Sequence, residues 1–221
     1  MTIRKGNQII GGISSLILAS TYIFGIAILF IVFGPTSDHK VSGHEKLQYI
    51  IDHKAMYQTW MLVICVVFGI VLVPLVVAIS DNFTKQSTFL TRNTPVFGFI
   101  WSVLIIASGM IAVHGIDTIE VVFETNPNSA LTSWQTIEVI QYGLGGAIEI
   151  LGGIWVFLIS IASLKFSKFN KSFSCFGLVV GVTGILTIIP VFKDLGIVFG
   201  ITQIVWFILL GILMIRNDNL E

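Results

Sequence analysis

Long apolar runs separated by short polar segments make up most of the chain. Each run is close to the length of about 20 residues that an α-helix needs to cross a bilayer. A soluble core has no use for so many continuous apolar segments, so the pattern predicts an all-α, polytopic transmembrane bundle of six helices. We expect a single integral membrane domain over residues 1–221, with spans at about 9–34, 57–80, 95–116, 141–164, 173–192 and 195–215.

The first apolar run follows Arg4 and Lys5, as the apolar part of a secretory signal would. It is much longer than the roughly 7–15 residues of a signal, and no small-x-small cleavage pattern follows it. We therefore expect an uncleaved first span. Thr21 and Tyr22 near its middle give it a mildly polar side, which we interpret as a packing surface.

A polar segment, residues 35–56, separates the first two spans and carries its own helical pattern. Leu47, Ile50 and Ile51 alternate with charged residues at helical spacing, and Ser42 with Glu45 fits a capping box. We expect a short interfacial amphipathic helix on the outer membrane surface. The histidines of this segment lie beside acids, but their spacing favours solvated surface residues over a loosely built metal site; they are His39, His44 and His53.

Composition narrows the class further. Hydrophobic residues make up 55% of the chain and charged residues 11%, with 12 basic and 12 acidic side chains. A net charge of zero gives no indication of nucleic-acid binding. Cys65 and Cys175 lie on different spans, so we expect no disulfide framework.

The basic residues also predict an orientation. With the N-terminus inside, eight of the twelve are cytoplasmic, which satisfies the positive-inside rule. We therefore expect the cell (inner) membrane, with both termini cytoplasmic. The eight are Arg4, Lys5, Lys85, Arg92, Lys165, Lys168, Lys171 and Arg216; Lys40, Lys46, Lys54 and Lys193 would lie outside.

Glu149 is the main candidate for function, because it is an acid inside the apolar run 141–164. A carboxyl group in hydrocarbon costs several kcal/mol unless it is neutralised, paired or hydrated. Tyr142 and Glu138 precede it on the same helical stripe, while Thr187 and Gln203 fall at a similar expected depth. These positions predict an outward-facing polar pocket, floored by Glu149, that binds a proton, cation or small ligand. The alternative is a neutral structural carboxyl group bonded to Gln203, Thr187 or a helix carbonyl.

A second candidate lies at the outer end of the third span. His114, Asp117 and Glu120 could offer nitrogen and oxygen ligands to a divalent cation. Their spacing matches no recognised metal motif, so a solvated helix end is the favoured interpretation. We predict no resident cofactor apart from this outer-face cation.

Glycines recur at four-residue spacing in the last two spans, at Gly177 and Gly181 and again at Gly196 and Gly200. Such faces let helices approach closely within a chain, or between copies and partner chains in a homo- or hetero-oligomer. Close packing within the chain is enough to explain them.

The last two spans carry a resemblance. GLVVGVTGILTIIPVF at residues 177–192 and LGIVFGITQIVWFILLGILMIR at residues 195–216 resemble the C-terminal hairpin of an uncharacterised family of six-helix bacterial integral membrane proteins, known as a domain of unknown function. The polar first loop is similar as well. The resemblance implies the architecture and no catalytic residue.

Three functions remain open. No P-loop, dinucleotide fingerprint, HExxH or GxSxG pattern is present, so nucleotide-driven hydrolysis has no support. We favour a non-enzymatic membrane protein that recognises or carries a small ligand or ion. The alternatives are a structural or accessory subunit without transport, and an intramembrane metalloenzyme that uses the outer histidines and acids.

Overall fold

The computed structural model describes residues 2–34, 41–146 and 149–216, and all regular structure in these residues is helical. The expected all-α class is therefore confirmed. Asp38, His39 and Lys40 lie outside the described residues. The helices are α1 (Thr2–Ile31), α2 (Gly43–Asp52), α3 (Lys54–Met61), α4 (Phe68–Asp81), α5 (Phe89–Thr125), α6 (Pro127–Gln141), α7 (Ile150–Phe166), α8 (Lys171–Leu186) and α9 (Leu195–Arg216), with π-helical segments η2 (Leu62–Val67) and η3 (Tyr142–Gly146) and the 3-10 turn η4 (Pro190–Phe192).

Among the described residues, five helical stretches are long and apolar enough to cross a membrane. Four of these stretches correspond to the first, second, third and sixth predicted spans. The remaining stretch, Pro127–Phe166, combines α6, η3 and α7 and includes residues 147–148, which the structure does not describe. The five are Lys5–Ile31, Lys54–Asp81, Phe89–Thr125, Pro127–Phe166 and Leu195–Arg216.

The fifth predicted span is shorter than expected. The run 173–192 becomes α8, whose 16 residues extend about 24 Å, less than the roughly 30 Å of a bilayer core. The α-helix ends at Leu186 because Thr187 leads into a turn and Pro190 begins the 3-10 turn η4. A sixth span therefore stays a prediction.

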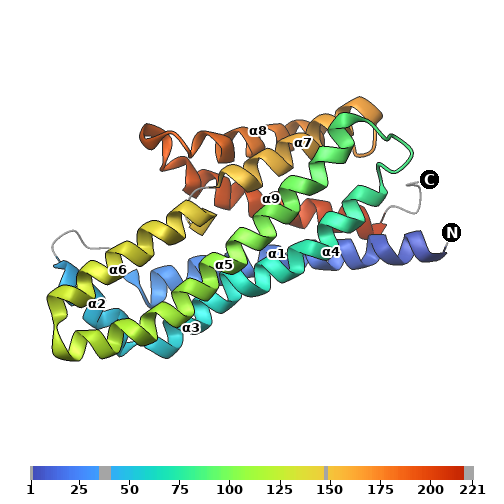
Figure 1. Cartoon of the computed structure of the whole chain (residues 1–221). Helices are drawn as coiled ribbons and strands as arrows, with labels where there is room; N and C mark the ends of the chain where they lie inside the picture. Colours follow the sequence, from blue (N-terminus) through green and yellow to red (C-terminus); the bar gives the residue numbers. More distant parts are fainter. Residues whose placement is uncertain (1, 35–40, 147–148, 217–221) are drawn as a thin grey trace.

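The long helices run side by side along one axis, and α5 extends from one end of the bundle to the other (Figure 1). Its 37 residues extend about 55 Å, well beyond a bilayer core. The start of α1 and the end of α9 lie at the same end of the molecule (Figure 1).

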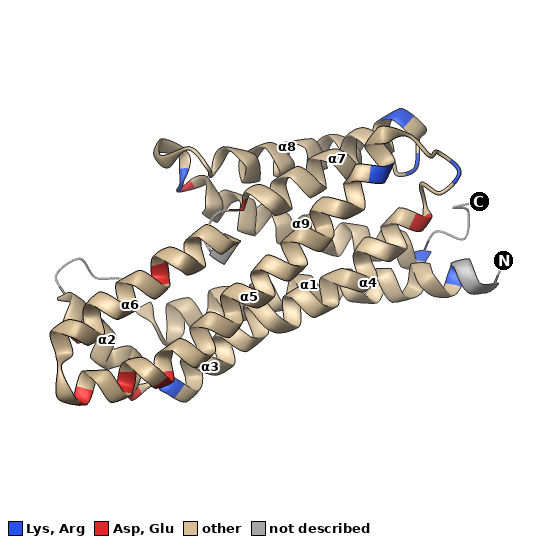
Figure 2. Cartoon of the chain, viewed as in Figure 1, with Lys and Arg blue, Asp and Glu red and all other residues tan. Residues whose placement is uncertain are grey.

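Charge divides the two ends of the bundle. Basic residues gather where α1 starts, where α4 joins α5, where α7 joins α8 and where α9 ends (Figure 2). We call this the basic end. At the opposite end, acids gather on α2, which carries Glu45 and Asp52, and at the end of α5, which carries Asp117, Glu120 and Glu124 (Figure 2).

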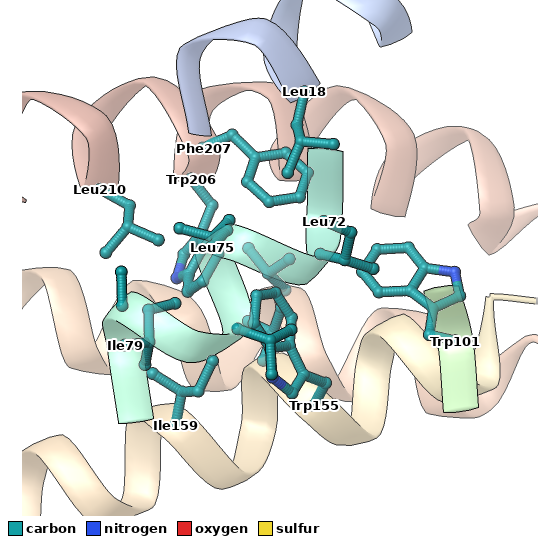
Figure 3. Close-up of a cluster of buried hydrophobic side chains, with 14 of the residues drawn as sticks. Leu18, Leu72, Leu75, Ile79, Trp101, Trp155, Ile159, Trp206, Phe207 and Leu210 are labelled. Atoms are coloured by element: carbon teal, nitrogen blue, oxygen red, sulfur yellow. The ribbon is translucent and has the colours of Figure 1, made fainter. Parts of the chain in front are cut away.

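The main core lies between the long helices and is rich in aromatic side chains. Trp155 on α7 has its ring centroid 6.0 Å from Trp101 on α5 and 5.9 Å from Trp206 on α9. Leu18, Leu75 and other aliphatic residues fill the space around these rings (Figure 3). Burial of this row fixes α5, α7 and α9 relative to one another.

A second, smaller core joins α2 to α5 and α6. Leu47 of α2 is completely buried there with Ile116, Ala130 and Trp134. The helix begins with the predicted capping box: the Ser42 N–H donates to the Glu45 carboxylate at 2.8 Å, and this bond lowers the pKa of Glu45. The predicted helix and its cap are thus observed, whereas its position on a membrane surface stays a prediction.

Glycines let α7 and α8 approach closely. A methyl group added to Gly153 would come within 2.6 Å of the Ile185 nitrogen, and one added to Gly181 within 2.7 Å of Phe157. The glycines of α8 therefore serve packing within the chain, as expected.

Candidate functional site

The fourth predicted span is broken where a continuous helix was expected. Helix α6 ends at Gln141, η3 follows, and α7 starts only at Ile150. Gly145 has φ +94° and ψ 16°, a left-handed conformation that glycine adopts without strain from a side chain. The prediction of one unbroken helix over 141–164 is therefore wrong, because an apolar run says nothing about where glycine allows the backbone to turn.

The break places Glu149 at the N-cap of α7. Its backbone N–H donates to the Thr187 hydroxyl at 3.0 Å, and that hydroxyl donates to the Gly184 carbonyl at 2.7 Å. Glu149 and Thr187 are thus brought together as predicted, although the contact uses the backbone of Glu149 rather than its carboxyl group. The side chain makes no capping hydrogen bond to α7.

A cavity of about 180 Å³ lies beside Glu149. Its walls come from α1, α3, η2, α4, α5 and η3, so both π-helical segments border it. Such segments in α-helices often mark functional sites. The lining residues are Thr21, Tyr22, Gly25, Ile26, Leu29, Trp60, Ile64, Cys65, Phe68, Ile105, Gly145 and Glu149.

The cavity is mainly apolar and has one charged group. None of its described lining residues is Lys, Arg or His, so Glu149 faces no basic side chain there. Two of the polar donors are already used: Thr21 donates to the Leu18 carbonyl at 2.8 Å and the Trp60 indole N–H to the Gly25 carbonyl at 3.1 Å. The carboxyl group therefore remains the dominant polar feature of the cavity.

Three aromatic rings line the cavity, on three different elements: Tyr22 on α1, Trp60 on α3 and Phe68 on α4. Tyr22 and Phe68 meet edge to face, with ring centroids 5.5 Å apart. None of these three rings was among the residues predicted to form the site. The only signal was the mildly polar pair Thr21 and Tyr22, which packing explained equally well.

Four of the five predicted ligand-binding residues do not line this cavity, and Thr187, which accepts a hydrogen bond from the Glu149 N–H, is one of them. Gln203 on α9 is completely buried, and neither atom of its amide has a hydrogen-bond partner among the described residues. Tyr142 is 48% exposed, and Glu138 is half-buried on α6. The stripe from Glu138 through Tyr142 to Glu149 is lost because the helix breaks between its members.

Two of the three predicted outer metal ligands, Asp117 and Glu120, lie against a lysine. The Lys54 ammonium group contacts Glu120 and lies 3.2 Å from an oxygen of Asp117. Gln58 also donates to Asp117, at 3.1 Å, whereas His114 is exposed. Among the described residues, no group of three or more His, Cys, Asp or Glu side chains could hold a metal ion. The cation site stays a prediction, and the Lys54 ammonium group already offsets one of the two negative charges of Asp117 and Glu120.

Compared with family models, with curated proteins and with solved structures, the chain has no match. The resemblance of its last two helices to a six-helix bacterial family therefore stays a prediction.

Proposed function

We propose that the chain is a multi-pass protein of the cell membrane that binds and carries a small ligand or cation in the cavity beside Glu149. The observation that supports this most is a coincidence of three features at one place: a carboxyl group, a broken apolar helix and a cavity. A carboxyl group and non-helical backbone each raise the free energy of a chain in hydrocarbon unless protein or water surrounds them. Their occurrence together beside a cavity is therefore best explained by a binding site.

The broken helix supports this function on physical grounds. In hydrocarbon, backbone groups without hydrogen bonds cost several kcal/mol each, so non-helical backbone occurs where it is buried in protein or lines a cavity. Carriers use discontinuous helices of this kind to form ligand sites near the membrane midplane. Gly145, where the helix is interrupted, and Glu149, the N-cap of α7, both line the cavity.

The distribution of charge supports an orientation for the site. The basic end belongs on the cytoplasmic side by the positive-inside rule, with both termini there. In this orientation α6 enters from the outer side, and η3, which follows its inner end, contributes Gly145 to the cavity wall.

The test is transport and binding by purified protein in proteoliposomes. A panel of protons, inorganic cations, small amines and neutral solutes would be tried on wild-type protein and on two matched variants. Glu149→Gln removes the charge in the cavity, and Glu138→Gln removes the same charge outside it. We expect uptake or binding of one solute class to fall more than roughly tenfold in Glu149→Gln and to stay unchanged in Glu138→Gln.

Two results would contradict the proposal. One is equal uptake and binding by wild type and Glu149→Gln. The other is a folded wild-type protein that neither moves nor binds any solute of the panel, which would favour the accessory-subunit alternative.

A further inference from the structure

The walls of the cavity restrict the chemistry of its ligand. They offer one carboxyl group, three aromatic rings and aliphatic side chains, with no basic residue among the described lining residues. An anion would meet the Glu149 carboxylate with nothing to neutralise it. Anionic ligands are therefore excluded on electrostatic grounds.

Hard inorganic cations fit poorly as well. Calcium takes six to eight oxygen ligands and magnesium a near-octahedral set of about six. Its lining side chains offer few oxygen atoms, those of the Glu149 carboxyl group and of the Thr21 and Tyr22 hydroxyl groups. A bare metal ion would lose its hydration without replacing it.

An organic cation suits both the carboxyl group and the apolar side chains that line the cavity. Its charge pairs with Glu149, and its alkyl groups lie against apolar side chains instead of needing oxygen ligands. Aromatic faces attract such cations, by roughly 2 kcal/mol or more when the site excludes water. Tyr22, Trp60 and Phe68 line the cavity from three separate helices, so rings are available on several sides of a bound cation.

Size limits the ligand further. At about 180 Å³, the cavity is smaller than the roughly 300–1,000 Å³ of pockets for drug-sized ligands. We propose that the cavity binds a small alkylammonium cation, held by the Glu149 carboxylate and enclosed by Tyr22, Trp60 and Phe68. This inference rests on the proposed function and specifies its ligand class.

An ammonium group could come from a free amine or from a lipid headgroup. Choline and ethanolamine headgroups carry a phosphate next to the ammonium, and that phosphate would lie near Glu149 without any basic residue to pair with it. A free cation brings no such charge. The cavity therefore favours the free form.

The experiment titrates detergent-purified protein with tetramethylammonium at pH 8 and measures the thermal unfolding midpoint and the heat of binding. We expect a saturable rise in the midpoint. Three controls accompany the titration: sodium has the charge without the alkyl groups, tert-butanol has a similar shape without the charge, and a short-chain phosphocholine lipid carries the ammonium group in a headgroup. We expect none of the three to raise the unfolding midpoint as tetramethylammonium does.

Variants connect the binding to the named residues. Glu149→Gln should weaken tetramethylammonium binding roughly tenfold or more, and Glu138→Gln should leave it unchanged. Tyr22→Leu, which removes a ring, should weaken it more than Tyr22→Phe, which keeps the ring and loses only the hydroxyl group.

The outcomes separate this inference from the proposed function. If a neutral solute or inorganic ion binds in a Glu149-dependent way and tetramethylammonium does not, the ammonium inference is wrong and the proposed function stands. If the phosphocholine lipid binds more tightly than tetramethylammonium, the free-cation form is wrong. If tetramethylammonium binds equally well to Glu149→Gln, the inference and the role of Glu149 both fail.

Discussion

Gln203 and Thr187 were both expected at the site, and the structure gives them different roles. Thr187 accepts a hydrogen bond from the Glu149 N–H and donates one to Gly184, so its hydroxyl group holds the start of α7. Gln203 is completely buried with both amide atoms unpartnered among the described residues. A buried polar group without a partner costs about 1–3 kcal/mol.

These two roles predict opposite mutational effects. Gln203→Leu, which replaces the amide by an apolar side chain, should leave the free energy of unfolding unchanged or raise it by about 1 kcal/mol. Thr187→Val keeps the shape of the side chain but leaves the Glu149 N–H without its acceptor, and should lower that free energy by about 1–3 kcal/mol. Equilibrium unfolding in mixed micelles measures both. A clear loss of stability in Gln203→Leu would mean that its amide has a partner after all.

The sequence identified Glu149 because an acid in an apolar run stands out from its neighbours. It could not identify Tyr22, Trp60 or Cys65, since aromatic residues and cysteine in apolar helices are ordinary packing residues. What assigns them to the cavity is the meeting of α1, α3 and η2 beside Glu149, which depends on tertiary packing.

The pairing of α7 with α8 depends on glycine. Any side chain at Gly153 would meet the backbone of α8, at Ile185 and Gly184, and backbone cannot move aside as a flexible side chain can. The glycine spacing predicted close helix packing, but the partner helix could not be read from it. Only the structure shows that α8 uses this face against α7.

Gly153→Ala should therefore destabilise the protein by about 1–3 kcal/mol through overpacking. The matched control is Gly196→Ala on α9, where an added methyl group would meet no atom within 4 Å. That change should be neutral or slightly stabilising, because alanine favours helix more than glycine does. Thermal unfolding of both variants tests the pairing, and equal midpoints would contradict it.

The interruption of the fourth predicted span could not be predicted from the hydrophobic pattern. Residues 141–164 are apolar enough to predict a single helix, and their glycines were interpreted as packing positions. Each glycine permits a turn without requiring one. Whether the chain uses that freedom depends on the free energy of contacts elsewhere, such as the bond between Glu149 and Thr187.

The described part of the molecule is asymmetric in charge along its long axis, and the start of α1 and the end of α9 lie together at the basic end (Figures 1 and 2). The all-helical class and most of the long apolar helices followed from the sequence because hydrophobic runs determine them directly. The small core that the end of α5 shares with α2 and α6 could not be predicted from the sequence. The pattern of a polar segment does not indicate which helix it will pack against.

This asymmetry predicts sidedness. In a background with Cys65 and Cys175 replaced by alanine, a cysteine introduced at Ser129, exposed in the first turn of α6, should react with a membrane-impermeant maleimide in intact cells. A cysteine introduced at Ser87, exposed between α4 and α5, should react only after the membrane is opened. The reverse pattern would contradict the orientation.

The central claim is that the Glu149 carboxyl group lies in a ligand cavity, and a lipophilic carbodiimide tests it most directly. Such reagents modify protonated carboxyl groups in apolar surroundings, so the reaction is run at a mildly acidic pH at which part of the carboxyl groups is protonated. Purified protein would be treated with and without tetramethylammonium, and the modified residues identified by peptide mass spectrometry. We predict modification at Glu149 that tetramethylammonium slows severalfold, with any reaction at Glu138 unaffected. An unmodified Glu149, in protein whose other carboxyl groups react, would contradict the account.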